Sequence, residues 1–120
     1  MEMSRKFKDL STQDFKKLPK LSSDHVMIGE ERIFLHLYNR KNMNWYLAEY
    51  GPISQKFFGF FEDKANGLFS GNCTKEDILK YSGRGDQWEP MVDESWQPVE
   101  AKEIEKLKAY IAIMKCPPDW

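Results

Sequence analysis

The chain has 120 residues, of which 41% are hydrophobic and 31% are charged, and its net charge is −1. This composition is that of an ordinary globular protein and excludes a disordered chain, and the length favours one domain spanning residues 1–120. A net charge so close to zero gives no electrostatic reason for the whole chain to bind nucleic acid or an anionic membrane.

The charges are nevertheless distributed unevenly along the chain. Residues 1–20 contain six basic side chains, and residues 86–105 contain seven acidic ones and a single lysine. Two such segments can be solvated surface or the two halves of a contact, and solvated surface is the more common case. We expect residues 1–9 to form a flexible basic head.

The cysteines and the N-terminus indicate the compartment. Cys73 and Cys116 have neither CxxC spacing nor a disulfide-rich pattern, which favours a reducing environment. The N-terminal residues lack the apolar core of a signal peptide, and no apolar run approaches the length that spans a membrane. These features predict a cytoplasmic protein that does not engage a membrane.

The first half of the chain predicts one short helix and two strands. Ser11 or Thr12 can cap the helix and Pro19 ends it. Its inward-facing residues would be Leu10, Phe15 and Leu18. Residues 32–39 and 44–50 are rich in β-formers and alternate with a period of two, as strands do. In the first strand one side would carry Ile33, Leu35 and Leu37, and the other side Phe34, His36 and Tyr38.

Residues 56–61, with the sequence KFFGFF, predict a third strand. Its two faces would carry Phe57, Gly59 and Phe61 on one side, and Phe58 and Phe60 on the other. Short turns between successive strands favour an antiparallel meander, and residues 68–71 predict a brief fourth strand. The glycine in the run indicates a bulge or a close approach of another backbone.

The second half of the chain predicts two helices and an edge strand. Thr74 caps a helix over residues 74–81, and residues 87–98 allow a short edge strand, since Pro90 is tolerated at an edge. Residues 99–115 show the clearest helical period, with an apolar stripe of Ile104, Leu107, Ile111 and Met114.

These elements together predict an α+β fold. It consists of a small, mainly antiparallel sheet of three to five strands, a C-terminal helix packed on one face, and short N-terminal and middle helices. The C-terminal helix would cover one set of phenylalanines in the third strand. The other set would need the N-terminal segment, a loop or a partner to cover it.

Metal binding and nucleophilic catalysis have little support in the sequence. The strong nitrogen and sulfur ligands are His25, His36, Cys73 and Cys116, and no two of them have metal-ligand spacing. There is no nucleophile elbow, phosphate-binding loop or dinucleotide fingerprint. We therefore predict no metal, no cofactor and no catalytic residue from motifs.

Three carboxylates and two tryptophans are the candidate binding residues. Glu49 ends the second strand on the expected face of Trp45 and Leu47, where a carboxylate needs a partner or a place at the rim. Asp93 and Glu94 lie between Trp88 and Trp96. Tryptophans beside charged residues are typical of interface anchors, and equally typical of loops folded over a small sheet.

Several of these segments resemble the DUF2958 family of small bacterial proteins. The likeness spans roughly residues 32–105 and rests on Trp45, Leu47 and Glu49 in the second strand, on Phe58-Gly59, and on "MVDESWQP" at residues 91–98. The chain departs from the family pattern at "NGLF" and "VDES", where a glutamate and an Arg-Asp pair are missing. The resemblance implies a cytosolic protein of a bacterium, phage or mobile element, and it implies no chemistry.

The sequence thus favours a non-enzymatic protein that binds a protein partner through an acidic, tryptophan-bearing surface. The candidate residues are Glu49, Trp88, Asp93, Glu94 and Trp96. A second hypothesis is a ligand-binding or hydrolytic site that uses Glu49 with Asp93 or Glu94. A third is nucleic-acid binding through the basic N-terminal segment and strand aromatics such as Phe34, Tyr38 and Tyr46.

Overall fold

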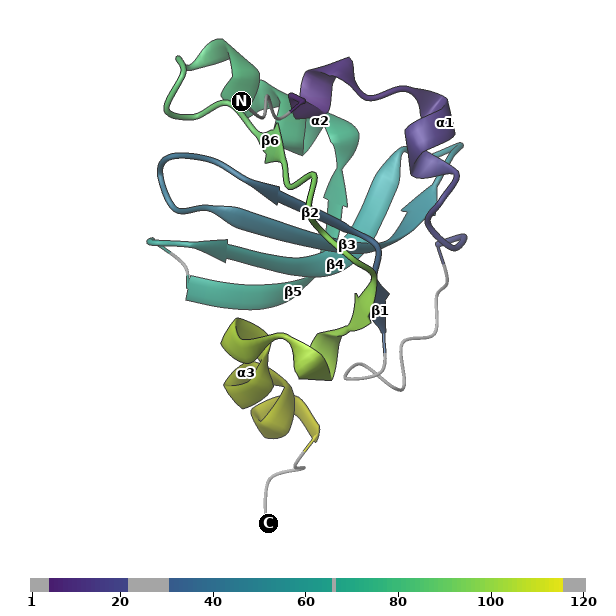
Figure 1. Ribbon diagram of the computed structural model, residues 1–120, viewed down its shortest axis with the longest axis vertical. Helices are drawn as coiled ribbons and strands as arrows, with labels where there is room; N and C mark the ends of the chain where they lie inside the picture. Colours follow the sequence, from purple (N-terminus) through teal and green to yellow (C-terminus); the bar gives the residue numbers. More distant parts are fainter. Residues whose placement is uncertain (1–4, 22–30, 66, 116–120) are drawn as a thin grey trace.

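The computed structural model describes residues 5–21, 31–65 and 67–115. Its centre is a five-stranded antiparallel sheet in the order β5-β4-β3-β2-β6, and a two-stranded sheet joins β1 to β7 (Figure 1). The strands are β1 (Arg32–Ile33), β2 (Leu35–Tyr38), β3 (Asn44–Gly51), β4 (Lys56–Asp63), β5 (Gly67–Thr74), β6 (Met91–Val92) and β7 (Val99–Glu100). The helices are η1 (Phe7–Asp9), α1 (Thr12–Phe15), α2 (Lys75–Leu79), η3 (Lys80–Gly83), η4 (Ala101–Glu103) and α3 (Glu105–Lys115). The predicted α+β fold class is confirmed.

Strand β4 divides its phenylalanines between two hydrophobic cores, as the alternation predicts. On the first face of the sheet, Phe57 and Phe61 pack with the N-terminal segment and with α2. On the second face, Phe58 and Phe60 pack with α3. Figure 1 shows α1 and α2 on one side of the sheet and α3 on the other. All four phenylalanines of the run are buried, so the run does not form an exposed hydrophobic patch.

The first-face core joins segments that are far apart in sequence. Its buried members are Phe7, Leu10, Phe15, Leu18, Leu37, Met43, Trp45, Leu47, Tyr50, Phe57, Phe61, Ile78 and Val92. The second-face core is smaller and consists of Ile33, Tyr46, Ala48, Phe58, Phe60, Ala101, Leu107 and Ile111. The predicted inward residues of the first helix, and Ile111 and Leu107 of the last helix, are therefore core residues.

Gly59 allows β4 to approach β3 closely. A Cβ atom at this position would lie 2.0 Å from the carbonyl oxygen of Tyr46, far inside any van der Waals contact. Of the two roles expected for this glycine, the close backbone approach is confirmed. The bulge lies in β3, the strand that pairs with β4 at Gly59.

The bulge on β3 changes the face on which Glu49 lies. Leu47 pairs with Gly59 and Glu49 pairs with Phe58, so Ala48 is an extra residue in β3. One extra residue reverses the alternation beyond it. Tyr50 consequently joins the first-face core, and Glu49 lies across from Phe58 on the second face. The expectation that Glu49 shares the face of Trp45 and Leu47 is wrong for this reason.

The strand predicted over residues 32–39 is broken at Phe34. Ile33 in β1 packs in the second-face core, whereas Leu37 in β2 packs in the first-face core and Leu35 lies against it. The backbone N–H of Phe34 donates to the carbonyl of Leu47 at the break. The single alternation expected for this segment is therefore wrong, because β1 leaves the main sheet to pair with β7.

The last helix begins later than residue 99. Val99 and Glu100 pair with β1 as strand β7, and the N–H of Ala101 donates to the carbonyl of Glu31. Ile104 has extended backbone angles, so α3 starts at Glu105. The pairing with β1 uses the backbone groups that an earlier helical turn would need. The side chain of Met114 lies outside the described residues.

Residues 5–9 are part of the fold, and the expectation of a flexible head is wrong for them. Phe7 is fully buried in the first-face core, and Lys6 forms an isolated bridge with Met91. The N–H of Val92 donates to the carbonyl of Arg5. Residues 1–4 lie outside the described residues. No helix in the described part of the chain is both long and apolar enough to cross a membrane.

Candidate functional site

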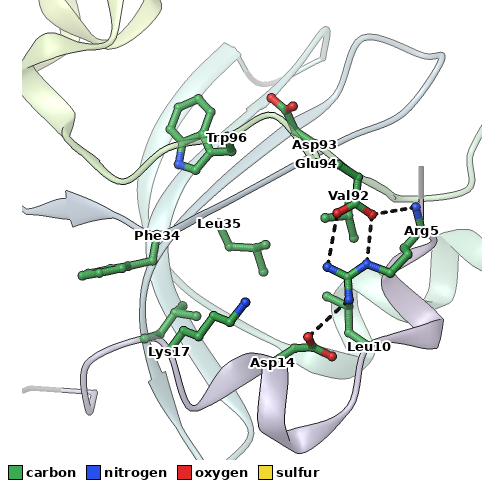
Figure 2. Close-up of a pocket in the computed structure, with 11 residues that line it drawn as sticks. Arg5, Leu10, Asp14, Lys17, Phe34, Leu35, Val92, Asp93, Glu94 and Trp96 are labelled. Atoms are coloured by element: carbon green, nitrogen blue, oxygen red, sulfur yellow. Dashed lines mark hydrogen bonds and ion pairs between the residues drawn. The ribbon is translucent and has the colours of Figure 1, made fainter. Parts of the chain in front are cut away.

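Three of the five predicted binding residues line one cavity. Asp93, Glu94 and Trp96 come from the segment around β6, and they face α1 across a hollow of about 140 Å³ (Figure 2). We call it the Trp96 cavity. Its lining residues are Arg5, Leu10, Asp14, Lys17, Leu18, Phe34, Leu35, Val92, Asp93, Glu94 and Trp96. The N-terminal segment thus supplies one wall and the acidic segment the other.

The cavity has an apolar floor and a charged rim. Leu10, Leu18 and Val92 belong to the first-face core, and Phe34 and Leu35 pack against that core. The charged side chains at the rim are Arg5, Asp14, Lys17, Asp93 and Glu94. Phe34 lies at the break between β1 and β2, outside both strands, and its side chain is therefore free to line this cavity.

Arg5 joins the two walls of the cavity. Its Nε donates to Oε2 of Glu94 at 2.9 Å and its Nη2 to Oε1 at 3.2 Å, while Nη1 reaches Oδ1 of Asp14 at 3.2 Å. The backbone N–H of Arg5 also donates to Glu94. The side-chain and backbone bonds from Arg5 hold the pKa of Glu94 below its ordinary value. The basic and acidic segments are therefore two halves of a contact, and the solvated-surface interpretation is wrong here.

A second ion pair also joins the N-terminal segment to the acidic segment. Lys8 Nζ lies 3.6 Å from Oε1 of the buried Glu89, and Ser82 Oγ donates to Glu89 as well. The pKa of Asp14 is lowered, first by the backbone N–H of Ser11 and then by Arg5. Two carboxylates of the acidic segment, Glu89 and Glu94, are thus paired with cations of the N-terminal segment.

Asp93 is bonded to His36 on the neighbouring strand. His36 Nδ1 donates to Oδ2 of Asp93 at 2.9 Å, and the N–H and hydroxyl of Ser95 donate to Oδ1. Burial opposes ionisation of Asp93, and the bonds from His36 and Ser95 outweigh it, so its pKa is lowered. Asp93 is therefore a carboxylate that fixes the turn after β6.

The same histidine continues a chain of hydrogen bonds across β3 and β4. Its Nε2 lies 2.8 Å from Oδ1 of Asn44, and the amide of Asn44 donates to Oε1 of Glu62 at 2.8 Å. Because the NH2 group of the Asn44 side chain donates to Glu62, its oxygen is the atom that faces the His36 ring. Both ring nitrogens of His36 thus lie within hydrogen-bond distance of a side-chain oxygen, one from Asp93 and one from Asn44.

Trp96 anchors the acidic segment to the second face of the sheet. Its indole Nε1 donates to the carbonyl of Ile33 at 3.0 Å. Its ring centroid lies 5.1 Å from that of His36 and 6.0 Å from that of Tyr46. Tyr46 and His36 stack at 4.7 Å. Trp96 is therefore partly buried by its own chain, while one side lines the cavity.

The structure does not bring Glu49 into the Trp96 cavity. Glu49 is buried, with 6% of its surface exposed, on the second face of the sheet. The cavity that Asp93 and Glu94 share has no lining atom from it. The hypothesis of a carboxylate pair made from Glu49 with Asp93 or Glu94 therefore finds no common pocket.

Trp88 lies at a separate groove of about 340 Å³ near the other end of β6. We call it the Trp88 groove. It is lined by Lys41, Met43, Asp63, Lys64, Ala65, Tyr81, Arg84 and Trp88. Sequence reasoning identifies the tryptophan and misses its neighbours, since the turn at residues 39–42 and the loop at 84–88 carry no functional motif. Of the missed cations, only Arg84 lies between Tyr81 and Trp88 in the sequence, and Lys41 and Lys64 carry no local signal.

The described residues offer little for covalent or metal chemistry. Burial, with a smaller contribution from Asp77, raises the pKa of the Cys73 thiol to about 12, and a thiol must ionise to act as a nucleophile. Within residues 5–21, 31–65 and 67–115, no three His, Cys, Asp or Glu side chains gather closely enough to hold a metal ion. Cys116 and His25 lie outside these ranges.

The chain matches no protein-family model, no curated protein and no solved structure at a significant level. The resemblance to the DUF2958 family therefore stays a hypothesis. The Trp96 cavity and the Trp88 groove must be interpreted from their own geometry.

Proposed function

We propose that this chain is a binding protein that recognises a protein partner at the Trp96 cavity. The observation that carries the proposal is the joint presence of Asp93, Glu94 and Trp96 at one hollow with an apolar floor and a charged rim. An aromatic wall, an apolar floor and a polar rim are the usual anatomy of an interface anchor site.

The size of the cavity favours a single side chain of a partner as its occupant. About 140 Å³ is well below the roughly 300–1,000 Å³ of small-molecule and cofactor sites. The walls are also held before any partner arrives, because Arg5 ties Glu94 to Asp14 across the opening. A prearranged pocket binds with a smaller loss of conformational freedom.

Lys17 indicates the charge of the partner. Figure 2 shows its ammonium group pointing into the cavity, and Lys17 forms no ion pair with another described residue. The other charges at the rim, by contrast, are paired. The partner segment would therefore place an apolar side chain on the floor and a carboxylate beside Lys17.

The setting of the protein is proposed from its sequence. The resemblance to the DUF2958 family favours a small protein of a bacterium, phage or mobile element. Cys73 is a free thiol, which suits a reducing cytoplasm. On this proposal the interaction takes place in the cytoplasm, with a protein rather than a membrane as the partner.

Site-specific photo-crosslinking in the native host tests this proposal. A photo-reactive amino acid replaces the exposed Gln97 next to Trp96 in one variant, and in another it replaces Ile53, which is 99% exposed in the turn between β3 and β4. We expect one defined crosslinked protein from position 97 and none from position 53. Crosslinks of equal yield at both positions would contradict the proposal.

A charge reversal with a matched control identifies the cavity itself. Lys17→Glu should abolish the crosslink from position 97, because it places a carboxylate opposite the partner's carboxylate. Lys16→Glu reverses the neighbouring exposed charge, which does not line the cavity, and should leave the crosslink intact. If both variants crosslink as the parent does, the cavity is not the binding site.

A further inference from the structure

The Trp88 groove concentrates positive charge on a chain whose net charge is −1. Lys41, Lys64 and Arg84 line it, against the single carboxylate of Asp63. None of these three cations forms an ion pair with another residue in the described ranges. They differ in this from Arg5 and Lys8, whose charges are taken up by carboxylates. The groove thus presents to solvent three cations that have no ion pair among the described residues.

Two aromatic rings form the wall of the groove. Tyr81 and Trp88 lie nearly parallel, with centroids 6.0 Å apart and an interplanar angle of 12°. The guanidinium carbon of Arg84 lies 4.9 Å from the Tyr81 ring and 5.4 Å from the Trp88 ring, and Lys41 Nζ lies 5.0 Å from the Trp88 ring. The two rings are thus nearly parallel, and cations lie within cation–π distance of both.

Hydrogen bonds from the Asn39 side chain stabilise this arrangement. Its side chain is buried, with 4% of the residue exposed. The amide donates to the carbonyl of Trp88 at 3.2 Å, and the side-chain oxygen accepts the N–H groups of Lys41 and Met43. Arg40 N–H also donates to the carbonyl of Gln87. The turn that carries Lys41 and the loop that carries Trp88 are therefore locked together, so the groove is formed before a ligand binds.

We propose that the Trp88 groove binds a nucleotide with an unpaired base, either free or within a single strand of nucleic acid. The base stacks on the wall made by Tyr81, Trp88 and the guanidinium of Arg84, and Lys41 and Lys64 bind the phosphate. Aromatic side chains and arginine planes are the groups on which unpaired bases stack, and ammonium groups on flexible stems bind phosphate as point charges.

The combination of rings and cations distinguishes this ligand from other anions. An acidic peptide would use Lys41, Lys64 and Arg84 but would leave the aromatic rings of Tyr81 and Trp88 without a partner. Double-stranded nucleic acid would use the same charges, but its bases are stacked on one another and do not reach a wall inside a groove. A nucleotide with an exposed base uses both features. This site is distinct from the Trp96 cavity, which neither Trp88 nor its cations line.

Fluorescence anisotropy with a labelled single-stranded oligothymidylate and an oligouridylate tests the proposal at low and rising salt. We expect binding whose logarithm falls with the logarithm of salt with a slope of about −2, since three cations each contribute about −0.7 on single strands. Unlabelled uridine monophosphate competes if a free nucleotide suffices, whereas competition by the oligonucleotide alone assigns the site to a strand. No binding of oligonucleotide or mononucleotide at low salt overturns the proposal.

Two charge-matched triple variants identify the groove. Lys41→Gln/Lys64→Gln/Arg84→Gln removes its three cations and should abolish binding. Lys6→Gln/Lys16→Gln/Lys20→Gln removes three exposed cations of the N-terminal segment and should bind as the parent does. Equal loss in both variants overturns the proposal, and so does preserved binding in the groove variant. The second variant also tests the earlier hypothesis that the basic N-terminal segment binds nucleic acid.

The role of the ring wall has its own test. Trp88→Ala should weaken binding about tenfold, as loss of base stacking does, and Trp88→Phe should restore most of it while circular dichroism reports that each variant is folded. Polyglutamate or duplex DNA of the same charge should bind more weakly than the single strand. Equal or tighter binding of either one shows that charge alone is recognised and overturns the proposal.

Discussion

The Trp96 cavity and the Trp88 groove each combine a tryptophan with charged side chains, but they use the charges differently. At the Trp96 cavity, every charged lining residue except Lys17 pairs within the described part of the chain, and the indole donates to the Ile33 carbonyl. At the Trp88 groove, cations lie on ring faces without carboxylate partners among the described residues. Charges that pair within the chain stabilise the fold, whereas charges without such a partner are available to bind a ligand of opposite charge.

This difference predicts how each region responds to substitution. Changes around Trp96 should alter stability first, because that tryptophan and its acids join the N-terminal segment, β1 and β6. Changes around Trp88 should alter ligand binding first. The sequence alone could not separate the two, since both tryptophans lie among acidic residues in the same segment.

The largest expected effect is that of Trp96→Ala on stability. The variant loses ring contacts with His36 and Tyr46 and leaves the Ile33 carbonyl without its indole donor. We expect the free energy of unfolding to fall by about 3 kcal/mol, measured by urea denaturation. Trp88→Ala serves as the control and should cost less than half as much. Equal losses would show that the two tryptophans do not differ in role.

A smaller loss is expected for Asp93→Asn. The amide is nearly the same shape, but it removes the charge that His36 Nδ1 and the Ser95 hydroxyl bond to. A hydrogen bond to a charged group contributes about 1.5–3 kcal/mol, and we expect a loss near 2 kcal/mol in urea denaturation. In a double-mutant cycle, Asp93→Asn/His36→Gln should lose less free energy of unfolding than the two single variants lose in total. An additive result would contradict coupling between the two residues.

Acid should weaken the Trp96 region before it affects the groove. The folded-state pKa values of Asp14, Asp93 and Glu94 are lowered by their hydrogen bonds, so the unfolded chain binds more protons than the folded chain at low pH. Their contribution to stability is complete above the unfolded pKa of about 4 and is lost as pH falls through the lower folded values. Thermal melts between pH 7 and pH 2 should show this loss.

The control for that experiment is the variant Asp14→Asn/Asp93→Asn/Glu94→Gln. Its melting temperature should be lower at pH 7 and should fall less steeply as pH decreases, because the groups that take up protons on unfolding are gone. If parent and variant lose stability in parallel, the three carboxylates are not responsible for the acid sensitivity.

The smallest expected effects on stability come from removing one cation from each region, and they compare the two regions directly. Arg5→Gln removes an exposed but doubly paired cation and should cost about 0.5–1 kcal/mol, less in high salt. Lys41→Gln removes a cation that has no ion pair in the described part of the chain and should change the free energy of unfolding by less than about 0.5 kcal/mol. Both are measurable as shifts in the urea midpoint. A larger cost for Lys41 than for Arg5 would reverse the comparison.

Much of the fold could be predicted because alternation and capping are local properties. The run in β4 places its phenylalanines as expected, and Thr74 caps α2 with Asp77 in a capping box. The errors arise where a distant segment decides the local structure. Val99 and Glu100 pair with β1 instead of beginning the last helix, and Phe7 is held by residues that are distant in sequence.

The candidate sites were predicted less completely than the fold. Asp93, Glu94 and Trp96 do meet in one cavity, but the contact between Arg5 and Glu94 spans 89 positions and no local pattern encodes it. The alternation places Glu49 on the wrong face, because the bulge at Ala48 has no sequence signal of its own. The Trp88 groove needs the 39–42 turn beside the 84–88 loop, an arrangement held by hydrogen bonds from Asn39 and Arg40 that no local pattern encodes.

The close approach at Gly59 also bears on how relatives of this chain can be recognised. The phenylalanines around it could be exchanged for other large apolar residues with modest repacking, so their identities can drift as lineages diverge. Any side chain at position 59 would collide with the Tyr46 carbonyl, so this glycine should persist when most of the sequence has changed. A saturation mutagenesis library selected for folded protein should therefore retain glycine alone at position 59 while tolerating several residues at Phe58. In remote alignments, that one glycine would be a better anchor than the four phenylalanines beside it.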